Sequence, residues 1–142
     1  MLFRSQAVGP DVELMLDVNC PWSPAEAIRI GRALAPYDLA WLEEPVWPPE
    51  DYRGLAEVAA ALDTPVAAGE NEATAVGFRE LIAQRSVDIL QPSVTKVGGL
   101  GEARKICALA AAWNVPVVPH SFYFGPGLAA TLHLIAATPG IR

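Results

Sequence analysis

Five polar residues follow short apolar segments at a nearly constant spacing, and this regularity constrains the fold more than any other feature of the sequence. Asp17, Glu43, Glu70, Ser93 and His120 are separated by 26, 27, 23 and 27 residues. A repeat of this length accommodates one strand, one helix and two loops, and eight such units close a parallel barrel of about 250 residues. A chain of 142 residues has room for about five to six units of this kind.

The segments between these residues predict alternating strands and helices, because short apolar runs alternate with longer amphipathic stretches. We expect strands near Val12–Asp17, Leu39–Glu43, Pro65–Gly69, Val87–Gln91 and Val115–Pro119. We expect helices near Pro24–Leu34, Pro49–Ala61, Thr74–Ala83, Leu100–Trp113 and Gly127–Ala136. The predicted fold class is therefore α/β, as part of a (β/α)8 TIM-type barrel.

An unclosed parallel sheet leaves two strand edges whose backbone groups need partners. The chain is therefore expected to be a fragment of a longer enzyme or to assemble with another chain, and we favour the fragment. A doubly wound open sheet is the structural alternative. The glycine-rich fingerprint of dinucleotide-binding folds does not follow the first predicted strand, which argues against that alternative.

Composition narrows the class of ligand. The net charge is −6 and the hydrophobic content is 52%, and no clustered basic patch is visible to attract nucleic acid or an anionic membrane. The first residues carry no signal-peptide pattern, and no apolar run is long enough to span a bilayer. We expect a cytoplasmic protein that binds a small molecule. Cys20 and Cys107 lack a partner motif and are expected to be reduced packing residues.

Acidic residues close three consecutive predicted strands, in the contexts Leu16-Asp17, Leu42-Glu43-Glu44 and Gly69-Glu70. The carboxyl ends of parallel barrel strands share one face, where three converging acids repel one another unless a cation lies between them. Ligation by oxygen alone suits Mg²⁺. Spacing does not decide between Glu43 and Glu44. The alternative is that these acids are solvated loop residues.

Four motifs in order resemble the mandelate racemase and muconate-lactonizing branch of the enolase superfamily. They are Asp17-Val18-Asn19, Trp41-Leu42-Glu43-Glu44-Pro45, Gly69-Glu70-Asn71 and Lys96-Val97-Gly98-Gly99. The resemblance implies that Asp17, Glu43 and Glu70 bind one Mg²⁺. It also implies removal of the proton alpha to a substrate carboxylate, with the metal stabilising the enolate that forms.

The resemblance implies that His120 is the general acid or base, a role that suits imidazole near neutral pH. The family pairs this histidine with an aspartate where this chain has Ser93. A serine can accept a hydrogen bond from the imidazole, but it brings no charge to stabilise imidazolium. We predict that Asn19, Asn71, Ser93 and Lys96 support the metal ligands or contact substrate, although Lys96 is more simply a loop residue. His133, among apolar neighbours, is expected to pack.

The resemblance predicts an acid-sugar dehydratase or racemase acting on a small hydroxy-carboxylate or sugar acid. We favour dehydration because one histidine can both remove the proton and assist the leaving hydroxyl, whereas racemisation needs two bases. Residues 1–142 are interpreted as a partial enolase-like C-terminal barrel domain, without the N-terminal capping domain and first barrel strands. We expect the full-length form to be a homo-oligomer. The alternatives are a non-catalytic metal-binding remnant and a generic α/β binding module.

Overall fold

Four parallel strands form one sheet in the computed structural model, which describes residues 7–9 and 11–141. The strands are β1 (Leu14–Asp17), β2 (Leu39–Glu43), β3 (Val66–Ala68) and β4 (Ile89–Leu90). Their order in the sheet is β1-β2-β3-β4, so each strand lies beside the next one in the sequence. The helical connections between neighbouring parallel strands are the βα units of a barrel wall. The predicted α/β class and partial barrel are confirmed.

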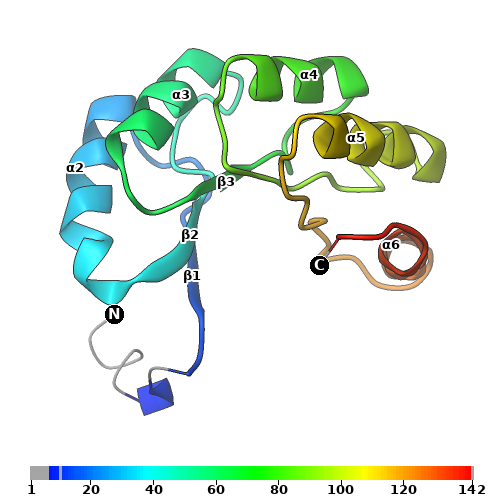
Figure 1. Cartoon of the computed structure of the whole chain (residues 1–142), viewed down its shortest axis with the longest axis horizontal. Helices are drawn as coiled ribbons and strands as arrows, with labels where there is room; N and C mark the ends of the chain where they lie inside the picture. The colour runs from blue at the N-terminus through cyan, green and yellow to red at the C-terminus, as the bar shows by residue number, and fades with distance from the viewer. Residues whose placement is uncertain (1–6, 10, 142) are drawn as a thin grey trace.

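Helices alternate with the strands along the chain. They are α2 (Pro24–Leu34), α3 (Tyr52–Ala61), α4 (Ala75–Ala83), α5 (Leu100–Ala112) and α6 (Pro126–Ala137), and a short 3-10 helix, η1 (Ala35–Tyr37), follows α2. Helix α6 packs against α5. Figure 1 shows α2 to α5 succeeding one another in an arc around the strands. Buried side chains of these helices meet the strands in one core that includes Leu55, Val66, Phe78, Leu90 and Ile106.

Side-chain caps fix where three of the helices begin. Ser23 and Glu26 form a reciprocal capping box at the start of α2, and Thr74 accepts a hydrogen bond from the Gly77 amide at the start of α4. Helix α3 begins at Tyr52, later than the predicted Pro49. The physical reason is Asp51, whose carboxylate accepts the Gly54 amide at 2.9 Å and so ends the preceding turn.

The predicted strand Val115–Pro119 is reduced to a single bridge between Val117 and Leu90. The Leu90 amide donates to the Pro116 carbonyl at 3.0 Å, and the Val118 amide donates to the Leu90 carbonyl at 2.9 Å. Pro116 and Pro119 have no amide hydrogen, so a longer ladder is not possible here. The prediction was wrong in extent, although the segment does lie beside β4.

The register of the sheet decides which side chains share a face. Met15 lies opposite Trp41, and Asp17 lies opposite Glu43. Because side chains alternate along a strand, these four residues point to the same face of the sheet. That face is the one turned away from the helices, and its carboxyl-terminal edge carries the candidate site. Among the described residues, no helix is both long and apolar enough to cross a membrane.

Candidate active site

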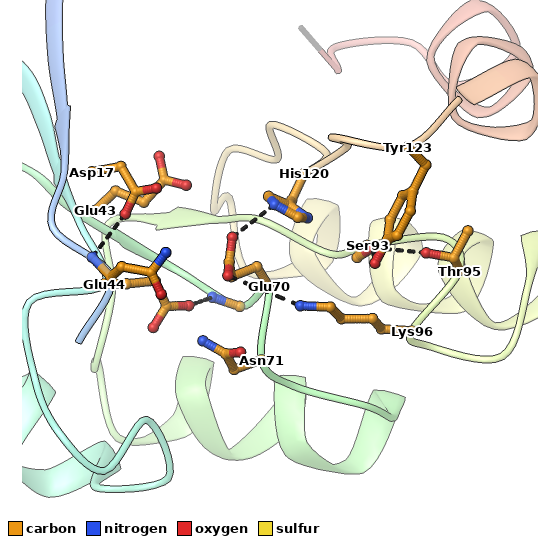
Figure 2. Close-up of polar contacts among 12 residues, drawn as sticks. Asp17, Glu43, Glu44, Glu70, Asn71, Ser93, Thr95, Lys96, His120 and Tyr123 are labelled. Atoms are coloured by element: carbon orange, nitrogen blue, oxygen red, sulfur yellow. Dashed lines mark hydrogen bonds and ion pairs between the residues drawn. The ribbon is translucent and has the colours of Figure 1, made fainter. Parts of the chain in front are cut away.

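Two carboxylates stand side by side at the carboxyl ends of β1 and β2. Asp17 and Glu43 are the last residues of their strands and are direct register partners. The Asn19 amide donates to Asp17 Oδ1 at 2.9 Å, and Trp41 Nε1 donates to Glu43 Oε2 at 2.9 Å. These two hydrogen bonds orient the carboxylates. Figure 2 shows the side chains of Asp17 and Glu43 next to each other.

The third carboxylate, Glu70, contacts the candidate base. Glu70 Oε2 lies 2.7 Å from His120 Nε2, and Glu70 Oε1 lies 3.9 Å from Lys96 Nζ. The side chains of Glu70 and His120 are only 11% and 14% exposed. The backbone holds the histidine, because its amide donates to the Pro92 carbonyl at 3.2 Å. Sequence reasoning placed Glu70, Lys96 and His120 in one site, and the structure brings them together.

Glu44 is buried and acts as a clamp between neighbouring loops. Its Oε1 accepts the Gly69 amide at 3.0 Å, and its Oε2 accepts the Cys20 thiol at 3.3 Å. Burial raises the pKa of Glu44 above its usual value, against the opposing effect of these hydrogen bonds. With Glu44 committed to this clamp, Glu43 is the acid of the pair that faces the site, a choice that the spacing alone left open and the resemblance favoured.

The Cys20 thiol is an inert part of this clamp. Burial, followed by the charge of Glu44, raises the pKa of Cys20 from 9.0 to about 12. A thiol with so high a pKa supplies almost no thiolate nucleophile at neutral pH. Cys20 is 8% exposed, in agreement with its predicted role as a packing residue.

Ser93 does not make the hydrogen bond that we considered for it. Its hydroxyl lies 3.2 Å from Thr95 Oγ1 and donates to the Tyr123 hydroxyl at 3.5 Å. His120 Nδ1 is buried without a hydrogen-bond partner in the described part of the chain. The serine is drawn away because two hydroxyl partners lie beside it. The His120 side chain is therefore oriented by Glu70 and not by Ser93.

Of the remaining residues considered from the sequence, Asn71 and Asn19 lie near the candidate site and His133 does not. Asn71 Nδ2 lies 3.8 Å from Cys20 Sγ, beside the Glu44 clamp. Asn19 contributes its backbone amide to Asp17, and the residue has a positive φ of 57°. His133 is exposed on α6, so the packing role predicted for it was wrong. Its neighbours in sequence are apolar, but its own position on the helix faces outward.

Sequence reasoning missed Thr95 and Tyr123 as neighbours of the site. Both hydroxyls meet the Ser93 side chain, and Figure 2 shows Tyr123 descending toward Ser93 beside His120. Tyr123 lies three residues after His120 in a loop, where no periodic pattern indicates the direction of a side chain. The presence of a hydroxyl-bearing residue in the loop after His120 was the only signal available.

The donor chemistry of Asp17, Glu43 and Glu70 suits a Mg²⁺ ion. All three present carboxylate oxygens at one edge of the sheet, and Mg²⁺ prefers such ligands. As the side chains stand, no group of three His, Cys, Asp or Glu residues in the described ranges is arranged to hold an ion. Glu70 is turned toward His120, so sharing an ion with Asp17 and Glu43 requires its side chain to swing toward them.

Comparison with known proteins defines the family. A family model described as enolase C-terminal domain-like matches residues 5–142, and the chain belongs to this family. D-galactarolactone cycloisomerase of Agrobacterium fabrum is 39% identical over 132 residues, which cover 93% of this chain and 35% of that protein. L-talarate/galactarate dehydratase of Salmonella typhimurium is 38% identical over 134 residues, covering 94% and 32%. The chain spans about a third of the length of these relatives.

Solved structures that resemble this chain indicate the branch of the family to which it belongs. A mandelate racemase/muconate lactonizing enzyme-like protein from Rubrobacter xylanophilus superimposes with a TM-score of 0.93 at 43% identity, covering 97% of this chain and 35% of that one. An enolase from Bradyrhizobium, complexed with magnesium and mandelic acid, gives 0.90 at 37% identity, covering 98% and 37%. L-talarate dehydratase from Polaromonas, complexed with Mg and L-glucarate, gives 0.88 at 34% identity, covering 97% and 37%. The predicted resemblance to the mandelate racemase and muconate-lactonizing branch is confirmed.

Proposed function

We propose that the protein containing this chain is a Mg²⁺-dependent enzyme that removes the proton alpha to the carboxylate of a sugar acid, most simply as a dehydratase. The observation that carries the proposal is the contact between Glu70 and His120, which places a candidate base 2.7 Å from a candidate metal ligand. Relatives that act on sugar acids, at 38% identity over 94% of this chain, support the same reading.

The proposed metal ligands are Asp17, Glu43 and Glu70, and Glu44 keeps the loop of Glu70 in place. Bound Mg²⁺ supplies a Lewis acid that stabilises negative charge as the alpha proton leaves. The hydrogen bonds from Asn19 and Trp41 hold two of the carboxylates in orientation before any ion arrives. Such preorganisation is what a metal site requires of its surroundings.

His120 is the proposed proton carrier, and Nε2 is the atom that acts. This nitrogen faces Glu70 across the site, while Nδ1 is buried. Proton transfer at Nε2 requires Glu70 to release it, as metal ligation by Glu70 also requires. In a dehydration, the imidazole takes the alpha proton and then returns a proton to the leaving beta hydroxyl, which departs as water.

A non-catalytic metal-binding protein is the second candidate. The observation that favours it is the neutral Ser93, which leaves His120 without a carboxylate at Nδ1. Such a protein binds Mg²⁺ but does not exchange substrate protons. A cytoplasmic location and a homo-oligomeric full-length form stay predictions.

Two measurements test the proposal. Calorimetric titration of the chain with Mg²⁺ should show one site that Glu70→Ala abolishes and Glu57→Ala retains, because Glu57 lies exposed on α3. Exchange of the alpha proton in D₂O, followed by proton NMR with galactarate, L-glucarate and mandelate as the acid panel, should then require Mg²⁺. Binding without exchange for every acid supports the non-catalytic candidate. Absence of Mg²⁺ binding overturns both.

A further inference from the structure

Three hydroxyl groups gather just beyond the end of β4, beside the Glu70 and His120 pair. Ser93 is fully buried, and its hydroxyl lies 3.2 Å from Thr95 Oγ1 and 3.5 Å from the Tyr123 hydroxyl. Figure 2 shows this cluster adjoining Lys96 and His120 on the side away from Asp17 and Glu43. The candidate metal ligands and the hydroxyl cluster therefore flank the histidine from two sides.

The Ser93 hydroxyl is shared between the other two hydroxyls. It donates to the Tyr123 hydroxyl at 3.5 Å, and in its 3.2 Å contact with Thr95 either hydroxyl can be the donor. A hydroxyl has one donor hydrogen and two acceptor lone pairs. Tyr123, which accepts from Ser93, therefore keeps a donor hydrogen that can turn to a ligand.

Packing fixes the position of the Tyr123 ring. Phe122 lies against it with ring centroids 4.3 Å apart, and the His120 ring meets it edge-on at 6.3 Å. Helix α6 approaches closely because position 127 is glycine, where an added Cβ would lie 2.9 Å from Thr95 Cγ2 and 3.1 Å from Tyr123 Cβ. A side chain held on several sides loses little freedom when it binds a ligand.

The three hydroxyls of the cluster are suited to hydrogen-bonding a hydroxyl group of a ligand. Ser93, Thr95 and Tyr123 are neutral and offer donors and acceptors, whereas the neighbouring edge carries acids. A neutral subsite avoids repelling an anionic substrate, and Lys96 beside Glu70 adds a positive charge. We propose that Ser93, Thr95 and Tyr123 form a subsite that binds a hydroxyl beyond the alpha carbon of a polyhydroxy carboxylate, with Tyr123 as the direct contact.

This inference rests on the proposed function, because it presumes that an acid binds over Glu70 and His120. Within that function, the Tyr123 hydroxyl selects a polyhydroxy acid over an acid with an apolar substituent. Hydrogen bonds from Ser93 and Thr95 lower the pKa of Tyr123, which makes the phenol a better donor. Tyr123 is assigned to substrate recognition, and the proton transfer is left to His120.

Calorimetry with the acid panel and Mg²⁺ tests the subsite without relying on turnover. Tyr123→Phe should weaken binding of galactarate or L-glucarate by about tenfold, the effect of one lost hydrogen bond. Binding of mandelate, whose substituent is a phenyl ring, should change by less than about twofold. Tyr37→Phe is the matched control, because Tyr37 precedes β2 at the opposite end of the sheet. Ser93→Ala should reproduce part of the effect and raise the Tyr123 pKa in a phenolate absorbance titration.

The outcomes separate the two proposals. Selective weakening in Tyr123→Phe supports the subsite even if no acid exchanges its alpha proton, in which case the proposed chemistry fails alone. Equal binding of a sugar acid by wild type and Tyr123→Phe overturns the subsite while leaving the chemistry intact. If the wild type binds mandelate and neither sugar acid, or binds none of the three, the subsite is also overturned.

Discussion

His120 Nε2 lies 2.7 Å from Glu70 Oε2, so the candidate proton carrier and a candidate metal ligand hold each other in the structure. Each role requires the contact to loosen: Glu70 must turn toward Asp17 and Glu43, and His120 must free Nε2. Binding of a cation by Glu70 would thus expose the nitrogen that we propose as the base. The two events are coupled through one hydrogen bond between the end of β3 and the segment beside β4.

Replacing His120 tests its proposed role as the base. In His120→Asn, alpha-proton exchange of a sugar acid should fall by about 10²- to 10⁴-fold, the usual contribution of a general base. Mg²⁺ binding should persist, because the three carboxylates remain. Proton NMR in D₂O and calorimetry measure the two effects separately, and His133→Asn on the exposed face of α6 is the control. Unchanged exchange in His120→Asn would show that another residue carries the proton.

Restoring an acid beside the histidine is the complementary change. Ser93→Asp should raise the rate of alpha-proton exchange, because a carboxylate near the unpartnered Nδ1 stabilises imidazolium. Ser93→Asn has nearly the same shape without the charge and should not raise the rate. Both variants disturb the bond to Tyr123, so the comparison between them isolates the charge. Equal rates for the Asp and Asn variants would contradict the prediction.

Removal of the Glu44 clamp should reduce stability. Glu44→Ala leaves the buried Gly69 amide without its acceptor, and the free energy of unfolding should fall by about 1–3 kcal/mol. Glu44→Gln should fall less, since a carboxamide oxygen can still accept this hydrogen bond. Urea unfolding followed by circular dichroism measures both values. An Ala variant as stable as the wild type would mean that the clamp only positions the loop.

The parts of this molecule that sequence predicted are those determined by local signals. Ser23-Pro24 marked the start of α2 at Pro24, and the apolar run ending in Glu43 marked β2, with the observed bounds in both cases. The constant spacing of strand-end residues placed Asp17, Glu43 and Glu70 on one edge. Such features depend on a few neighbouring residues, which a sequence displays directly.

Side-chain direction depended instead on contacts between distant segments. Glu70 turns toward His120, which lies beyond two further helices in the sequence, and Ser93 pairs with Tyr123, 30 residues later. The burial of Glu44 depends on the Gly69 amide and the Cys20 thiol, which only the folded sheet brings together. Periodicity gives the strand on which a residue lies, but long-range packing selects its partner.

The ion pair at the start of α5 gives a stability that depends on pH. Glu102 Oε2 lies 2.9 Å from Lys105 Nζ, and Glu102 Oε1 accepts the Ala75 amide of α4 at 3.1 Å. The bond with Lys105 and then the one from Ala75 lower the pKa of Glu102 in the folded state. Unfolding therefore takes up a proton between the folded and unfolded pKa values, so this contribution to stability rises with pH through that window. It is fully present above the unfolded value of about 4.3 and is lost as pH falls through the folded value.

Glu102→Gln should remove this part of the pH dependence. Urea midpoints measured at about pH 6 and about pH 3, on either side of the ordinary glutamate pKa, should differ less in the variant than in the wild type. Glu57→Gln, which removes an exposed partner 3.8 Å from Arg53, should leave the difference unchanged. If Glu102→Gln retains the full wild-type difference, the acid sensitivity arises elsewhere, and the link from α5 to the Ala75 amide of α4 does not depend on the charge of Glu102.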